Sequence, residues 1–124
     1  MLVLDGRVVG RGCVALMIHV IYKGRALPLA WRVRQGPKGP CPEALHLALV
    51  KLIRACLPEG TQVVVLGEGE FDGTTLQGTL QEAGGCYVCR TAQSTVATGE
   101  GESFRRDTLG ACLQPGRRMA LREV

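Results

Sequence analysis

Three valines and a leucine follow one another without interruption in the stretch TQVVVLG, residues 61–67. Side chains of a strand point alternately to the two faces of a sheet. A run without a polar position therefore predicts a central strand that is covered on both faces. Helices packed on the faces of a mixed or parallel sheet provide such cover, so the run indicates an α/β fold.

The flanking sequence predicts the order of the other elements. Strands are expected over 2–9, 13–22 and 25–33, and the short connections between them predict an antiparallel meander. Pro28 lies inside the third strand and favours an edge position or a bulge. Helix-linked strands pair in parallel, so the sheet should be mixed, with helices on its faces.

One helix is expected after a loop rich in glycine and proline, with Pro42 in its first turn and with Pro58 and Gly60 ending it, and a second over 74–85. The first has an apolar stripe with helical spacing, made of Leu45, Ala48, Leu49, Leu52, Ile53 and Cys56. A fifth strand follows in CYVCRT, residues 86–91. Residues 92–103 are polar and predict a loop, and the segment 117–124 is typical of the beginning of a strand.

Composition and charge limit the classes of partner. Of the 124 residues, 46% are hydrophobic and 21% charged, which is typical of one globular domain, and the net charge is +4. An excess of Arg and Lys favours an anionic partner such as nucleic acid. A solvated surface is the alternative explanation of the excess of Arg and Lys. No stretch predicts a membrane span or a signal peptide, so a cytoplasmic location is expected. The six cysteines are then predicted to be reduced, small, buried residues.

The valine-rich run ends in GEGEFDG, residues 67–73. The spacing of its glycines does not fit a dinucleotide-binding fingerprint, and its acids do not fit a calcium loop. Glu68 remains as a carboxylate just past the end of a buried strand, where open α/β sheets place their ligands. Asp5 interrupts the apolar run of the first strand, which is costly unless a cation compensates its charge.

Asp5 and Glu68 converge if the first strand and the valine-rich strand are neighbours. Two hard oxygen ligands of this kind suit Mg²⁺ or Mn²⁺, which could promote phosphodiester cleavage or strand transfer. The alternative is that Asp5 begins a turn with Gly6 and that Glu68 is a solvated surface residue. The residues alone leave both interpretations open.

The segments LVLDGRVVGRGCVALMIHVIYKGRALPLAW, VVVLGEGEFDG and YVCRT together resemble the catalytic domain of DDE transposases of bacterial insertion sequences, in the insertion-sequence-four group. The resemblance covers nearly all of the chain. It implies a ribonuclease-H-like fold, a DNA substrate, and metal-binding acids at Asp5 and at the position of Glu68.

The chain departs from the family's pattern in three respects. Glu68 stands where the family has Asp, and Asp72 is a nearby substitute whose place in the motif does not match. No residue corresponds to the family's third acid, a Glu on a later helix, and the family's N-terminal DNA-binding region is missing. These departures predict a truncated, C-terminally incomplete domain, with the partial catalytic core in residues 1–91. Residues 92–124 would begin a β-rich insertion or form a disordered tail.

Other residues are weaker candidates. Arg90, Arg34 and Lys38 are predicted nucleic-acid contacts, and an ordinary surface role is the alternative. Trp31 could stack on a base but is expected in the core. His19 and His46 are expected as packed or half-exposed imidazoles.

The sequence thus predicts a fragment of a DNA transposase that binds Mg²⁺ or Mn²⁺ weakly and has negligible cleavage activity alone. A non-catalytic nucleic-acid-binding or self-associating domain is the alternative, and a homo-oligomer could form through an uncovered sheet face.

Overall fold

The computed structural model describes residues 1–37, 39, 41–71, 73–99, 101–118 and 120. The chain divides into two compact units, Met1–Arg90 and Thr91–Val124. The sequence had placed a boundary between residues 91 and 92.

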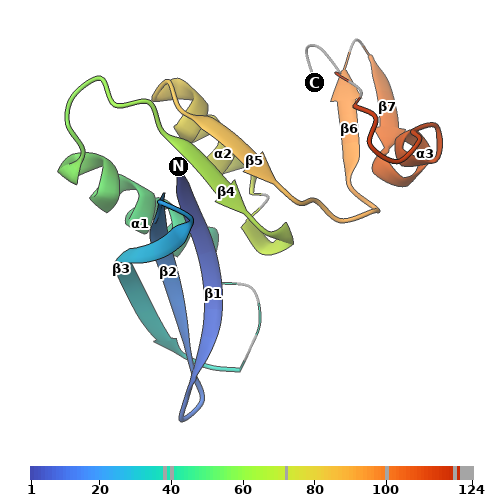
Figure 1. The fold of residues 1–124 in the computed structure, drawn as a ribbon. Helices are drawn as coiled ribbons and strands as arrows, with labels where there is room; N and C mark the ends of the chain where they lie inside the picture. The colour runs from blue at the N-terminus through green and yellow to red at the C-terminus, as the bar shows by residue number, and fades with distance from the viewer. Residues whose placement is uncertain (38, 40, 72, 100, 119, 121–124) are drawn as a thin grey trace. The chain divides into compact units, whose positions relative to one another are not determined.

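The first unit contains a five-stranded mixed sheet (Figure 1). Its strands are β1 (Leu2–Gly10), β2 (Cys13–Tyr22), β3 (Arg25–Gln35), β4 (Val64–Gly67) and β5 (Cys86–Cys89), in the order β3-β2-β1-β4-β5. β2 is antiparallel to both β1 and β3, whereas β4 is parallel to both β1 and β5. The predicted mixed α/β sheet, three antiparallel strands followed by helix-linked parallel ones, is confirmed.

Tight turns connect the first three strands. Arg11 and Gly12 have φ of 50° and 69°, and Lys23 and Gly24 have φ of 48° and 75°. Two-residue loops with positive φ at both positions match the right-handed twist of the flanking strands. Both connections are therefore hairpin turns, as the short spacing predicted.

β3 forms one edge of the sheet and contains Pro28. The register between β2 and β3 shifts between Ile18 and His19, where His19 pairs with Pro28. An edge strand with a bulge tolerates a residue that lacks an N–H donor. The predicted position of Pro28 is confirmed.

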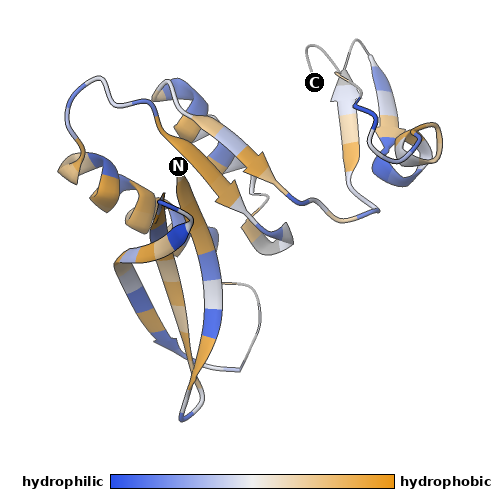
Figure 2. Ribbon diagram, viewed as in Figure 1, coloured by the Kyte–Doolittle hydropathy of each residue, from blue (hydrophilic) through white to orange (hydrophobic). Residues whose placement is uncertain are grey.

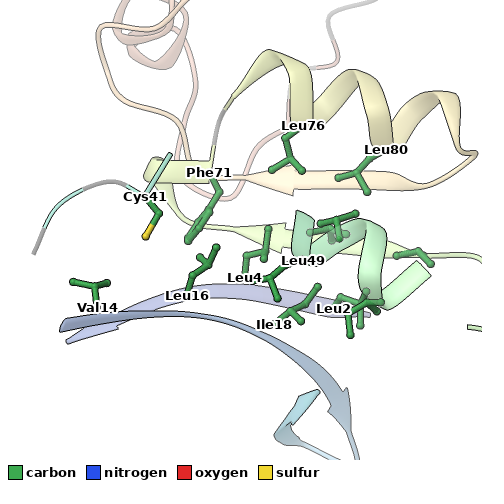
Figure 3. Close-up of a cluster of buried hydrophobic side chains, with 14 residues drawn as sticks. Leu2, Leu4, Val14, Leu16, Ile18, Cys41, Leu49, Phe71, Leu76 and Leu80 are labelled. Carbon is green, nitrogen blue, oxygen red and sulfur yellow. The ribbon is translucent and has the colours of Figure 1, made fainter. Parts of the chain in front are cut away.

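Two helices of the first unit, α1 (Glu43–Cys56) and α2 (Thr74–Glu82), pack on the same face of the sheet (Figure 3). One continuous core joins this face to both helices. It includes Leu4, Ile18 and Val65 from the strands and Leu49 and Leu80 from the helices, each at most 1% exposed. Burying these aliphatic side chains contributes about 1.5–3 kcal/mol each.

The expectation of helices on both faces is wrong for this unit. Val65 is buried, but its neighbours Val64 and Leu66 on β4 are only half-buried. The apolar run thus forms a central strand, although the helices in the described residues of the unit cover only one face of the sheet.

The predicted stripe of α1 is also partly wrong. The buried residues are His46, Leu49, Val50 and Ile53, whereas Leu52 is 45% exposed. Apolar residues occupy so many positions of this helix that two overlapping stripes have helical spacing. Packing against the sheet selects the one that contains His46.

None of the six cysteines forms a disulfide bond, as predicted, but most of them are not buried. Cys41 alone is buried, and Cys56, Cys86 and Cys112 are exposed. Cys86 is exposed and Cys89 half-buried in the alternating pattern of β5, which is poor geometry for a shared metal.

The second unit contains a hairpin of β6 (Val96–Gly99) and β7 (Glu102–Arg105), followed by α3 (Arg106–Ala111). The loop predicted over 92–103 is therefore wrong in part. The strand start predicted over 117–124 is not seen in residues 117, 118 and 120, and its other residues lie outside the described part. No helix in the described parts of the chain is long and apolar enough to cross a membrane.

Candidate functional site

The pairing of β1 with β4 brings the two predicted metal ligands to neighbouring positions. Leu4 pairs with Gly67 in the parallel register, so the next positions are Asp5 and Glu68. Backbones of neighbouring strands lie roughly 5 Å apart. The condition on which the site depended, adjacency of the first strand and the valine-rich strand, is therefore met.

Asp5 lies on the sheet face opposite the helices. It pairs with Met17 of β2, one position away from the buried residues Leu16 and Ile18. Its side chain is 41% exposed, and its carboxylate lies 3.8 Å from an Arg7 guanidinium nitrogen. A loose ion pair of two exposed groups adds little stability. Asp5 is in the middle of β1, so the alternative of a turn with Gly6 is wrong.

A tight turn after β4 explains why Glu68 lies at the tip of the strand. The short 3-10 helix η1 (Gly69–Phe71) folds Phe71 back into the core, where it is 1% exposed. A Cβ atom on Gly67 would lie 2.7 Å from Phe71 Cβ and 2.9 Å from the Tyr87 hydroxyl. Only glycine lets the chain turn this closely, and the turn leaves Glu68 exposed.

Arg90 follows β5 beside the two acids. Its backbone N–H donates to the Gly67 carbonyl at 3.1 Å, so parallel pairing continues past the end of β4. The register Gly67–Cys89 makes Glu68 and Arg90 the next pair of positions. Asp5, Glu68 and Arg90 thus occupy one row across three adjacent strands.

The sheet face opposite α1 and α2, called the open face below, is largely apolar. Trp31 pairs with Met17, and Met17 pairs with Asp5, so these three residues share the open face. The alternation of apolar and polar residues along β3 is visible in Figure 2. Further residues of this face are Val3, Ala15, Val33, Leu66 and Val88.

Trp31 is not in the core, contrary to the sequence-based expectation. Its side chain is 59% exposed, and Val33 and Val88 are each 57% exposed. Trp31 lies on an edge strand, on the face that neither helix of the unit covers. An apolar strand position is buried only where a second layer packs on it, which a single sequence does not reveal.

Arg34, another predicted nucleic-acid contact, is not at the acids, since it pairs with Val14 and lies on the edge strand β3, three strands away from β4. Arg34 donates from Nη2 to the carbonyls of Gly39, at 3.1 Å, and Pro37, at 3.5 Å. Its Nε lies 3.5 Å from Cys41 Sγ. Arg34 therefore holds the loop before α1. Lys38 and Asp72 lie outside the described residues.

Sequence reasoning missed a polar contact between the two helices. Glu43, in the first turn of α1, accepts a hydrogen bond from the Leu76 N–H at 2.8 Å. Leu76 is in the first turn of α2, which has no side-chain cap of its own. A negatively charged carboxylate at this end also interacts favourably with the positive end of the helix dipole. Glu43 thus serves as the N-terminal cap of α2.

His46 lies next to this contact and is 2% exposed. Its ring is 4.7 Å from the Phe71 ring, and its Nε2 has no hydrogen-bond partner among the described residues. Burial lowers the pKa of His46, and the negative charge of Glu43 partly opposes this effect. The neutral imidazole packs as a core residue.

Asp5 and Glu68 fit a weakly held divalent cation better than a closed metal site. The described residues contain no cluster of three or more His, Cys, Asp or Glu side chains that could hold a metal. Two neighbouring, solvent-accessible carboxylates supply hard oxygen ligands, and Mg²⁺ usually retains several waters beside one or two carboxylates. The arrangement suits an ion that remains mostly hydrated.

Arg7 also belongs to this site and was not predicted. The spacing Asp5–Gly6–Arg7 in a strand places the first and third side chains on one face, which is a signal that the sequence contains.

Comparison with known proteins identifies no relative, since no family model, curated protein or solved structure matches the chain.

Proposed function

We propose that residues 1–90 form a ribonuclease-H-like domain related to the catalytic domain of DDE transposases. The observation that carries the proposal is the parallel register of β1 and β4, which makes Asp5 and Glu68 neighbours. The strand order β3-β2-β1-β4-β5, with an antiparallel meander followed by helix-linked parallel strands, supports it. The substrate class is DNA, and the reaction class of the parent enzyme is metal-dependent phosphodiester cleavage and strand transfer.

Asp5 and Glu68 would hold Mg²⁺ or Mn²⁺ on the open face. A bound ion supplies charge stabilisation at the phosphate and lowers the pKa of an attacking water. Arg90 extends the same row and provides a cation for a neighbouring phosphate oxygen. Arg7 shares the charge of Asp5 when no ion is bound.

Two carboxylates are fewer than the family's three, so the proposed domain binds metal weakly and cleaves negligibly by itself. Glu68 is one methylene longer than the family's Asp, and a displaced ligand lowers the rate further; a 1 Å displacement can cost about 100-fold. Nicking of DNA in Mg²⁺ or Mn²⁺ that disappears in the Asp5→Ala variant would contradict this part of the proposal.

Metal binding is tested by adding Mn²⁺ to the ¹⁵N-labelled protein and recording amide line broadening. We expect selective broadening around Asp5 and Glu68, because a paramagnetic ion broadens nearby amides most. The Asp5→Asn and Glu68→Gln variants should each lose it. Glu59→Gln, which removes an exposed carboxylate before β4, is the matched control and should keep it. Broadening that ignores both site variants would refute the metal site.

A second candidate is a domain that binds nucleic acid without cutting it. The basic composition of the antiparallel meander favours this candidate, since residues 1–37 contain six Arg or Lys and one acid. DNA binding that is salt-dependent, but independent of metal and of the Asp5→Asn change, would favour it over the first.

A further inference from the structure

The open face combines an exposed aromatic ring with a rim of cations. Trp31 is 59% exposed on β3, and the exposed Arg7 lies on the same face, two positions after Asp5 on β1. Further exposed cations lie at its borders: Arg11 in the turn between β1 and β2, and Arg90 after β5. The neighbours of Trp31 across β2 and on β3 are uncharged, namely Met17, Ala15 and Val33.

The charges decide which kind of partner fits this face. A second copy of the chain would bring the same excess of cations to the contact, and like charges brought together oppose association. A purely apolar partner would remove water from the carboxylate of Asp5 without compensating its charge. A polyanion gains from the same cations, because their contact with phosphates releases condensed counterions.

The aromatic ring decides the form of the polyanion. A base can stack on an exposed indole only when its own ring face is free, which is the case in single strands and not inside a duplex. A sheet surface with an aromatic residue and surrounding cations provides this combination of stacking and phosphate contacts.

We propose that the open face binds single-stranded nucleic acid, with one base stacked on Trp31 and phosphates contacting Arg7 and the cations of the rim. Trp31 is two strands away from Asp5, a backbone distance of roughly 10 Å. A strand that binds at Trp31 can thus reach the row of Asp5, Glu68 and Arg90. This inference rests on the nucleic-acid substrate of the proposed function. It adds that the substrate is single-stranded and that it runs across the open face from Trp31 to the row of Asp5, Glu68 and Arg90.

Trp31 is the only tryptophan of the chain, so its intrinsic fluorescence reports on this face directly. We expect a short oligothymidylate, added in EDTA at low salt, to quench the emission of Trp31. A duplex of the same length should quench it much less. EDTA removes metal binding from the experiment, so the result does not depend on Asp5 and Glu68 as ligands.

Variants test the stacking contact by anisotropy of a labelled oligothymidylate. Trp31→Ala should weaken binding roughly 5- to 150-fold, the range for the loss of one base–aromatic stack. Trp31→Phe should retain most of the affinity, because a ring remains. Leu27→Ala is the matched control: Leu27 is 44% exposed on the same strand but pairs with Val20, which packs against the core on the helix-covered face. It should bind as tightly as the unchanged protein.

Three results would overturn the proposal. These are no quenching of Trp31 by the oligothymidylate, equal affinity of the Trp31→Ala variant, or an emission shift that depends only on protein concentration. The last result would assign the face to a second copy. If the oligothymidylate quenches Trp31 but Mn²⁺ does not broaden the amides around Asp5, the binding face stands and the metal site is refuted. If Mn²⁺ broadens these amides but the oligothymidylate does not quench Trp31, only the binding face is refuted.

Discussion

Gly67 connects the core to the candidate site at the scale of a single residue. The close approach of Phe71 and Tyr87 leaves no space for a side chain at this position. The same contact sets where β4 ends and therefore where Glu68 lies.

A Gly67→Ala substitution should destabilise the protein by about 1–3 kcal/mol, since the added methyl group overpacks a filled site. Urea unfolding measures the change. Gly78→Ala is the matched control, because Gly78 is inside α2 and a Cβ there meets nothing within 4 Å. This control should stabilise the protein by about 0.5–1 kcal/mol. Equal effects of the two substitutions would contradict the role assigned to Gly67.

His46 makes stability depend on pH. Burial lowers its pKa in the folded state below the ordinary value of 6.5, so the unfolded chain binds the proton more readily. The free energy of unfolding should therefore fall as the pH is lowered below about 6.5, by at most about 1.4 kcal/mol per pH unit from this group.

Denaturant unfolding between about pH 7 and pH 5.5 tests this dependence. His46→Leu should flatten the curve in this window. Leu52→Ala, a change at a half-exposed position of the same helix, should leave its shape unaltered. A His46→Leu protein with the original pH dependence would show that another group is responsible.

At the scale of elements, α1 and α2 depend on each other through Glu43. The Glu43 carboxylate, in the first turn of α1, accepts a hydrogen bond from the Leu76 N–H of α2. A side chain on Gly73 would overlap this carboxylate. Neither helix has a side-chain cap from its own N-cap residue.

Glu43→Ala should lower the free energy of unfolding by about 1–2 kcal/mol, as for the loss of an N-terminal cap. Glu43→Gln keeps an oxygen acceptor and should cost less. Glu59→Ala, at an exposed position, is the control with the same loss of charge. If Glu59→Ala costs as much as Glu43→Ala, the effect is one of net charge and not of the cap.

The elements also show what a single sequence can predict. Alternation, turn residues and helix spacing predicted β1 to β5, α1 and α2, because these signals are local. The choice between the two stripes of α1 was not local: His46 is buried only because the sheet and Phe71 lie against it. Trp31 is exposed because neither α1 nor α2 covers its face of the sheet, and the hairpin β6–β7 was missed because its residues are mostly polar.

The candidate site, like the fold, was predictable where its signals are local. Asp5 interrupts an apolar strand and Glu68 ends one, and both signals are visible in the sequence. Their adjacency required the strand order, and the tertiary roles of Arg34 and Glu43 required contacts across the fold.

At the scale of the whole molecule, the two units differ in what stabilises them. Every residue of the buried core, from Leu2 to Leu80, belongs to the first unit. None of the residues 91–98, 101–118 and 120 is buried. The second unit is held by the hairpin pairing and by polar contacts such as the ion pair of Arg105 with Asp107, at 2.8 Å.

A chain shortened to residues 1–90 should therefore keep its free energy of unfolding within about 0.5 kcal/mol, as for changes away from a core. Urea unfolding followed by Trp31 emission compares the shortened and full chains. The isolated segment 91–124 should unfold without a cooperative transition, since its described residues bury no apolar side chain that could offset the entropy of ordering the backbone. A large loss of stability in the shortened chain would contradict this prediction.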